Sequence, residues 1–228
     1  MKHSGRAFRS AIKLIFWTLV LLLAVFAVGA LASLLSLVIA TVSIALITVW
    51  ILFAIFSLYF FRDPDPAGPS ILNAIVSPAH GKVDVIDETT EAEFIGGPCK
   101  RISIFLSIFD VHVQKAPVSG KIAWLKQTPG KFLSATRADS AEHNENVLLG
   151  FEPADFPGQK VAVRLIAGVI ARRIVPWVAL GDTVARSERI SLIQYGSRCD
   201  LYLPRSVKIH IKLGDKVRGG ESLVASFE

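Results

Sequence analysis

Hydrophobic and polar residues divide the chain into a long apolar segment and a body of short apolar runs. From Leu14 to Phe61, 48 consecutive residues include no Lys, Arg, Asp, Glu or His. A membrane-spanning helix needs about 20 apolar residues, and one helix of the whole segment, rising about 1.5 Å per residue, would be more than twice as long as the hydrocarbon core of a bilayer. The pattern therefore predicts two helices joined by a turn near Gly29–Ser33.

A cleaved signal peptide is the alternative interpretation of this segment. Its apolar region would be only about 7–15 residues long and would end at a small-residue cleavage site. The observed segment is much longer, so its length favours two retained transmembrane helices. We therefore expect residues 1–61 to form a membrane anchor.

The pattern changes to that of short strands in residues 62–228. A proline-rich linker, Asp63–Pro69, comes first. After it, apolar or alternating runs are separated by Gly-, Pro- and Asp-rich breaks. The expected strands are Lys82–Ile86, Arg101–Phe105, Lys121–Leu125, Val161–Ile166, Ile190–Gln194, Leu201–Leu203 and Val207–Ile211. Since Pro176 interrupts the apolar run Ile170–Val178 and no other segment has a long helical period, a β-dominated domain of sandwich or barrel type is predicted.

Two internal repeats indicate matching strand–turn–strand elements. Pro78–Val83 and Pro117–Ile122 share the pattern P-x-x-G-K-Φ, where Φ is apolar, and Leu180–Glu188 and Leu213–Glu221 share L-G-D-x-V-x-x-x-E. Gly and Asp tolerate the left-handed conformations of tight turns. The second pattern resembles the hairpin turns of biotinyl and lipoyl carrier domains, which implies a flattened β-sandwich, although the lysine-bearing hairpin tip of a carrier is missing.

Charge is unevenly distributed along the chain. The formal net charge is +6, but residues from Arg62 onward contain 21 basic against 19 acidic residues. The four remaining basic residues precede the first acidic residue and are Lys2, Arg6, Arg9 and Lys13. This distribution argues against a nucleic-acid partner and is typical of an N-terminus that stays in the cytoplasm. Because two helices return the chain to the same side, we expect the inner (cytoplasmic) membrane with the body facing the cytoplasm.

Common catalytic motifs are missing, which leaves single residues as candidates. The sequence has no Gly-x-Ser-x-Gly elbow, Walker loop or His-Glu-x-x-His pair. Its five histidines do not have metal-ligand spacing, and its two cysteines are too few for a disulfide scaffold, so no metal site is expected. His210 lies in an alternating run and is interpreted as a strand residue. His112 is the better catalytic candidate because it precedes a turn and has polar neighbours.

An isolated Gly-Ser dipeptide is normally a turn, but the residues that flank Gly196-Ser197 indicate a catalytic role for this pair. From Phe61-Arg62-Asp63-Pro64 to its last residues, the chain resembles the phosphatidylserine decarboxylase family in its short bacterial form with an N-terminal membrane anchor. The motifs that carry the resemblance are Ser77–Val83, Phe109–Val113, Pro117–Lys121, Pro129–Phe132, Ile166–Gly168, Ala171–Val175, Gly196–Arg198 and Asp200–Pro204.

The resemblance implies a proenzyme that cuts itself between Gly196 and Ser197. The serine would become an N-terminal pyruvoyl group, which serves as the cofactor. Residues 1–196 would form the membrane-bound β chain, and residues 197–228 would form the α chain. The two chains would remain together as a heterodimer or a higher oligomer. The ketone would form a Schiff base with phosphatidylserine in the bilayer, accept the electrons released with CO2, and so yield phosphatidylethanolamine.

Further site residues follow from the same resemblance. His112 is the general acid–base candidate because imidazole titrates near neutral pH. Lys115 and Arg198 are candidates for binding the substrate phosphate or carboxylate. As basic residues near a membrane, both could equally be surface charges.

The sequence departs from the family pattern at two places. At His80 the family usually has an Asp that is assigned to the self-cleavage triad. Three alternatives follow: His80 itself acts as the base on Ser197, Asp84 substitutes for the missing Asp, or cleavage fails and the chain is a degenerate homologue. The second departure is at Ser140–Val147, where the family commonly reads Asn-Glu-Arg-Asn and the Arg is missing or displaced. The competing class is a membrane-anchored adaptor of the biotinyl/lipoyl type without enzymatic activity.

Overall fold

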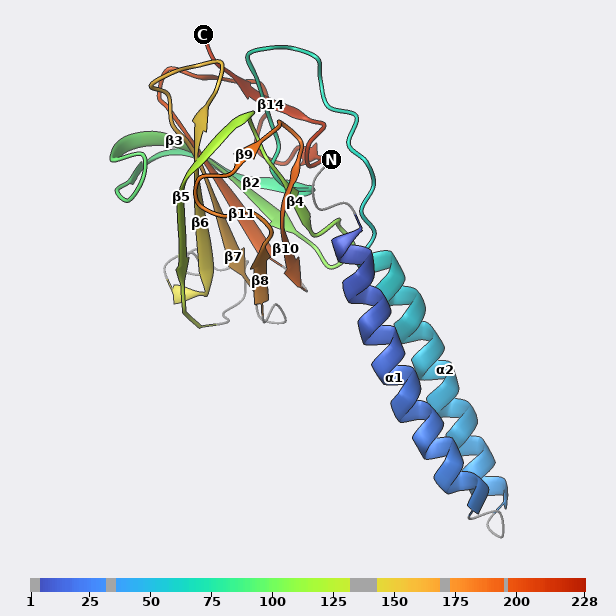
Figure 1. Cartoon of the computed structure of the whole chain (residues 1–228). Coiled ribbons are helices and arrows are strands. Elements are labelled where there is room, and N and C mark those ends of the chain that lie inside the picture. The colour runs from blue at the N-terminus through green and yellow to red at the C-terminus, as the bar shows by residue number, and fades with distance from the viewer. Residues whose placement is uncertain (1–4, 32–35, 132–142, 169–172, 195–196) are drawn as a thin grey trace. The chain divides into compact units, whose positions relative to one another are not determined.

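The structure is a computed structural model, and it describes residues 5–31, 36–131, 143–168, 173–194 and 197–228 (Figure 1). It consists of two compact units: one is Gly5–Asp63 and the other contains Pro64–Glu228. The first is helical and the second is built from strands.

The helical unit is a pair of long apolar helices. They are α1 (Arg6–Leu31) and α2 (Ser36–Phe60), and the side chain of Trp50 in α2 donates a hydrogen bond of 2.7 Å to Thr18 Oγ1 in α1. Within them, Arg6–Ala30 and Val38–Phe60 are long and apolar enough to cross a membrane.

The turn predicted near Gly29–Ser33 begins later than expected, because α1 continues through Gly29 to Leu31. The residues between the two helices, 32–35, lie outside the described part of the chain. An isolated Gly costs a helix only about 1 kcal/mol relative to Ala. Gly29 also lies close to α2, since a Cβ there would be 3.3 Å from Ile39 Cγ2. Its small size therefore serves helix–helix contact and does not end the helix.

The second unit contains three antiparallel sheets. The large sheet has the order β13-β2-β3-β11-β7-β6-β5-β9, and the two small sheets have the orders β4-β10-β8 and β1-β14-β12. The strands of the large sheet are β2 (Gly81–Glu91), β3 (Gly97–Leu106), β5 (Gly120–Thr128), β6 (Asn146–Pro153), β7 (Val161–Ala167), β9 (Thr183–Val184), β11 (Ser197–Leu203) and β13 (Lys216–Val217). Those of the small sheets are β1 (Ala74–Val76), β4 (Val113–Lys115), β8 (Arg173–Pro176), β10 (Arg189–Gln194), β12 (Lys208–Ile209) and β14 (Leu223–Ser226).

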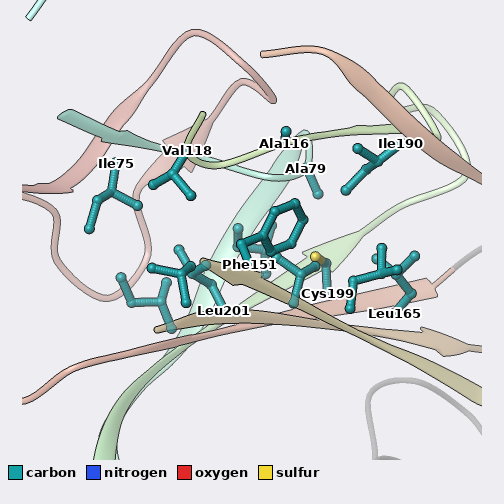
Figure 2. Packing of buried hydrophobic residues seen from close by; sticks show 14 of the residues in the cluster. Ile75, Ala79, Ala116, Val118, Phe151, Leu165, Ile190, Cys199 and Leu201 are labelled. Atoms are coloured by element: carbon teal, nitrogen blue, oxygen red, sulfur yellow. The ribbon is translucent and has the colours of Figure 1, made fainter. Parts of the chain in front are cut away.

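The core fills the space between the large sheet and the small ones. Figure 2 shows Phe151, Leu165, Cys199 and Leu201 of the large sheet facing side chains from the segments opposite, among them Ile190. Because side chains alternate along a strand, the core residues Cys199 and Leu201 put Ser197 on the same inner face. Burying this apolar face is the main source of stability for the domain.

The two sequence repeats form equivalent halves of the large sheet. Each half combines one copy of each sequence pattern. From here on, the first repeat means residues 78–83 with the turn at residues 213–215, and the second repeat means residues 117–122 with the turn at residues 180–182. Each turn contacts its own strand, because Gly214 N donates to Val83 O and Gly181 N to Ile122 O, both at 2.8 Å. Both glycines have the positive φ that such a turn requires, 92° and 94°.

The two repeats are joined to each other reciprocally. Val76 N donates to Pro117 O at 3.0 Å, and Lys115 N donates to Pro78 O at 2.8 Å. Each donor stands two residues before the proline of its own repeat. The paired halves are therefore related by an approximate twofold axis. Counted inward from the two edges of the large sheet, β13, β2, β3 and β11 correspond to β9, β5, β6 and β7.

Most expected strands are present, with informative differences at β6, β11 and β12. The prediction omitted β6, which is buried on both faces and shows no alternation. The strand expected at Leu201–Leu203 begins four residues earlier, at Ser197. The one expected at Val207–Ile211 is reduced to Lys208–Ile209, and beyond it His210 Nε2 lies 2.8 Å from Ser226 Oγ.

Candidate functional site

Ser197 is the first residue of a central strand and is completely buried. It lies opposite Leu106 of β3 and Ala167 of β7. Its hydroxyl has no hydrogen-bond partner among the described residues, although buried polar groups are nearly always paired. Gly196, the other half of the predicted cleavage site, lies outside the described part of the chain. A buried hydroxyl without a hydrogen-bond partner among the described residues is therefore present next to the expected cut.

His112 is buried in the loop that continues from β3 past Ser197. Its backbone oxygen accepts a hydrogen bond of 3.1 Å from Ile193 N near the end of β10, so the loop is tied to the strand that leads to Ser197. The ring Nδ1 lies 2.9 Å from Asp110 O. Because a carbonyl oxygen can only accept, this contact assigns a proton to Nδ1, so that in the neutral form of the ring the basic electron pair is on Nε2.

Asp110 gives this loop its shape. Its carboxylate accepts hydrogen bonds of 2.8 Å from both the backbone N and the hydroxyl of Ser107. The loop therefore closes on itself immediately after β3. This closure fixes the backbone oxygen that holds the His112 ring.

His80 lies at the same end of the large sheet as Ser197. It precedes β2, in which Lys82 pairs with Phe105 of β3, and Phe105 in turn pairs with Arg198. The side chain is half-buried, and a Cβ on Gly219 would be 3.2 Å from His80 Cδ2. The absence of a side chain at Gly219 thus provides the room that the imidazole occupies.

Arg198 forms an ion pair with Asp84 across β3. The bond joins Arg198 Nη2 to Asp84 Oδ2, and the other carboxylate oxygen, Oδ1, is buried with no hydrogen-bond partner in the described residues. Burial raises the pKa of Asp84, and the positive charge of Arg198 opposes that rise. A surface cleft of about 420 Å³ opens beside this pair, lined by Lys82, Val83, Asp84, Phe105, Leu213 and Gly214.

Lys115 is fully buried and lies away from Arg198. It pairs in register with Arg189 at the start of β10, whereas Ser197 follows the end of β10. Arg189 Nη2 lies 2.7 Å from Asp65 Oδ1. This bond and the charge of Arg189 lower the pKa of Asp65, with a smaller contribution from Lys115. The two basic residues predicted to bind substrate therefore belong to different surroundings.

Two buried asparagines that the sequence reasoning did not assign to the site lie beside Ser197. Asn144 Nδ2 donates to the backbone oxygen of Ala167 at 2.7 Å, and Asn146 Nδ2 donates to Asn144 O at 3.0 Å. Ala167 is the register partner of Ser197. The signal was their position in the segment that departs from the family pattern, of which residues 140–142 lie outside the described part.

A second polar cluster lies on the outer face of β11. Asp200 is almost fully buried there, and Tyr202 donates a hydrogen bond of 3.4 Å to it. Burial raises the pKa of Asp200 even though Arg198 and Arg101 act to lower it. Among the described residues, no group of three or more His, Cys, Asp or Glu side chains is arranged to hold a metal ion.

Comparison with known proteins supplies a family for this site. A family model described as phosphatidylserine decarboxylase matches residues 53–225. The phosphatidylserine decarboxylase proenzyme of Desulfotalea psychrophila is 44% identical over 179 residues, which cover 78% of this chain and 83% of the relative. That of Syntrophus aciditrophicus is 42% identical over 173 residues, covering 76% and 80%. The range that the family model matches spans the positions of Ser197 and of the other candidate residues described above.

Proposed function

The chain belongs to the phosphatidylserine decarboxylase family, and we propose that Ser197 is the residue from which it makes its own pyruvoyl group. The activity that goes with this family is the removal of the serine carboxyl group of phosphatidylserine as CO2, which leaves phosphatidylethanolamine. The observation that carries the proposal is the buried hydroxyl of Ser197, which has no hydrogen-bond partner among the described residues. The relatives are named proenzymes, which agrees with a precursor that must be processed.

Self-cleavage requires only groups of the chain itself and water. Ser197 Oγ attacks the carbonyl carbon of Gly196, and the amide nitrogen takes up a proton as the peptide bond becomes an ester. Removal of the Ser197 α proton then expels Gly196 as a carboxylate and leaves dehydroalanine. Tautomerisation and hydrolysis release ammonia and leave a ketone at the new N-terminus. The β chain would be residues 1–196 and the α chain residues 197–228.

The buried position of Ser197 suits this conversion. Complete burial keeps bulk water from the ester before elimination takes place. The pyruvoyl group, once present, supplies a carbonyl that reacts with the substrate amine and withdraws electrons from the bond to the carboxyl group. The remaining tasks, moving protons and holding the headgroup, belong to side chains.

We assign proton transfer to His112 and His80. Two observations support His112. Its Nδ1 is bonded to Asp110 O, which fixes the orientation of the ring, and its loop begins directly after Leu106, the residue of β3 opposite Ser197. For His80 the support is its location at the same sheet end, where the family usually has an Asp. A neutral imidazole accepts a proton as a carboxylate does, so His80 serves as the base for cleavage and His112 as the acid–base group for decarboxylation.

Headgroup binding is assigned to Arg198 and Lys115. Arg198 carries a guanidinium, which suits the carboxylate or phosphate of a bound headgroup, although its side chain lies on the face of β11 opposite to that of Ser197, where it pairs with Asp84. Lys115 lies three residues after His112 and is fully buried, so the headgroup would have to reach it inside the domain. Both residues remain assignments made from position and charge.

The helical unit is proposed to anchor the enzyme in the inner membrane, with the body in the cytoplasm. The two apolar helices support an anchor, and the four basic residues before Leu14 support a cytoplasmic N-terminus. Such an anchor keeps the active site beside a substrate that never leaves the bilayer. A reporter that is active only outside the cytoplasm, fused after Glu228, should be inactive.

The test of the proposed function is the fate of the Ser197 bond. The wild-type chain, purified in detergent and denatured, should separate into two fragments, and mass spectrometry should find a 32-residue fragment with an N-terminal pyruvoyl group. Ser197→Ala should remain a single chain without decarboxylase activity. A wild-type chain that stays whole would instead identify a degenerate homologue, and an intact N-terminal serine on the fragment would exclude the pyruvoyl route.

A further inference from the structure

The strand β2 contains an irregularity beside the cleavage site. Val83 pairs with Ile104 and Val85 with Ser103, so Asp84 is an extra residue without a register partner in β3. Such a β-bulge changes the direction of a side chain relative to regular alternation. Here the bulge directs the carboxylate of Asp84 over β3 to Arg198, the residue next to Ser197.

The second repeat has the same bulge without the carboxylate. In β5, Ile122 pairs with Phe151 and Trp124 with Gly150, which leaves Ala123 as the extra residue. The bulge therefore forms without an acidic side chain. The carboxylate on β2 is an addition to a backbone feature that both repeats share.

The ion pair is a poor device for stability. Burial raises the pKa of Asp84 despite the adjacent guanidinium, which means that desolvation of the carboxylate outweighs the attraction. One carboxylate oxygen is also buried without a hydrogen-bond partner among the described residues. A charged pair kept at such a cost is better explained by the placement that it gives to Arg198.

We propose that Asp84 is a positioning residue that, through Arg198, holds the first residues of the α chain in the sheet after self-cleavage. The inference rests on the proposed function, because it requires the cut before Ser197. In the precursor, residues 195–196 tie β11 covalently to β10. After the cut that tie is lost, and Arg198, now the second residue of its chain, is bound by charge to the β chain. The pyruvoyl group is thereby kept where the serine stood.

The test compares Asp84→Ala with a variant of a second ion pair of β2, which joins β2 to β3 and does not involve β11. Asp87 pairs with Arg101 through two hydrogen bonds, of 2.6 and 3.0 Å, but lies further from Ser197 along β2. Asp84→Ala is expected to fold, because Ala123 already occupies the equivalent bulge. Asp87→Ala is the control, and Asp84→Glu should restore the wild-type behaviour by keeping the charge.

Hydrogen exchange of the α-chain amides is the main measurement. In processed protein, amides at the start of β11 should exchange about tenfold faster in Asp84→Ala than in wild type or Asp87→Ala. In uncut protein carrying Ser197→Ala, adding Asp84→Ala should change this exchange much less, because the covalent tie remains. Cleavage itself should proceed, and kcat should fall by about 10- to 100-fold with little change in KM, because the ketone is misplaced.

Four results would overturn the inference. Equal exchange in processed Asp84→Ala and wild type would show that nothing is held by the pair. The same increase in the uncut protein would assign Asp84 to general sheet stability, and a loss confined to KM would assign it to headgroup binding. A wild-type chain that never cuts would remove the proposed function and this inference together, whereas the other results leave the proposed function intact.

Discussion

The two repeats of the large sheet share a backbone, yet only the first lies at Ser197. Both have a Gly-Asp turn bonded to a G-K-Φ strand, and both have a bulge two residues beyond the lysine. They differ in side chains: His80 and Asp84 of the first correspond to Ser119 and Ala123 of the second. The candidate site thus differs from the equivalent place in the second repeat by a few polar side chains on a backbone that both halves share.

The surface hollows of the two repeats support the same conclusion. The cleft of the second repeat, lined by residues that include Lys121, Glu152 and Lys160, measures about 470 Å³, against about 420 Å³ beside Asp84. The larger cleft lies near the start of β7, whereas Ser197 pairs with Ala167 at the end of that strand. Size therefore does not distinguish the half that we propose to be functional; its proximity to β11 and the identity of its polar residues do.

The largest difference between the repeats is expected at positions 80 and 119. His80→Ala should slow self-cleavage by about 10²- to 10⁴-fold, the usual contribution of a general base. Ser119→Ala should leave the cleavage rate unchanged, since Ser119 belongs to the half away from Ser197, where its hydroxyl accepts a hydrogen bond of 2.9 Å from Arg186 N. A time course of fragment appearance on denaturing gels measures both.

His80→Asp sharpens this test because it restores the residue that the family usually has. It should cleave at least as fast as wild type. If His80→Ala cleaved at the wild-type rate, the base would have to be sought at Asp84 or His112. If the wild type were inert and His80→Asp active, the chain would be a degenerate homologue that lacks one carboxylate.

An intermediate effect is expected at the glycines that begin β2 and β5. A Cβ on Gly81 would lie 2.2 Å from Phe105 O, and one on Gly120 would lie 2.1 Å from Glu152 O. Either alanine substitution should destabilise the domain by about 1–3 kcal/mol through overpacking, read as a lower thermal midpoint. Only Gly81→Ala should also slow cleavage, because it displaces the strand pair beside Ser197. Equal slowing by Gly120→Ala would contradict the division between the halves.

The contribution of the Asp84 carboxylate to thermal stability is expected to depend on pH. Since the pKa of Asp84 is raised in the folded state, its contribution to stability is complete below the ordinary value of 3.8 and is lost as pH rises through the folded value. The thermal midpoint of wild type relative to Asp84→Ala should therefore decrease as pH is raised from about 3 to 7. A relative midpoint that rises over this range would mean that the ion pair stabilises the fold.

The smallest loss of stability is expected at the two Gly-Asp turns, and it should be the same in both halves. Asp182 accepts a hydrogen bond of 2.9 Å from Ala179 N, and Asp215 accepts one of 3.0 Å from Lys212 N. Replacing either aspartate with alanine should cost about 0.5–1.5 kcal/mol, the net value of one hydrogen bond. Thermal midpoints that fall by clearly different amounts would show that the two turns are not equivalent.

Sequence patterns predicted what is encoded locally. The two apolar helices and both Gly-Asp turns follow from runs and spacings of a few residues. By contrast, the bulge at Asp84 is defined by register against β3, and the bond between Asp84 and Arg198 joins residues 114 positions apart. No local pattern contains that information.

Burial on both faces also limits what a pattern can reveal. The strand β6 is apolar on both sides and so lacks the alternation by which strands are recognised. The position of Ser197 inside a strand was hidden for a related reason, because Gly196 beside it favours a turn. The candidate site residues were named from family motifs, whereas the contacts of Asn144 and Asn146 beside Ser197 required the folded chain.

The interleaving of the C-terminal 32 residues has a consequence for the life of the enzyme. These residues supply β11 to the middle of the large sheet, β13 to its edge, and β12 and β14 to a small sheet, where β14 lies between β1 and β12. One continuous chain can reach this arrangement by closing loops within itself. After a cut before Ser197, an unfolded molecule would have to recombine from two pieces, and its rate of recovery would fall with dilution. The processed enzyme is therefore assembled once, and its working lifetime is set by how slowly it unfolds.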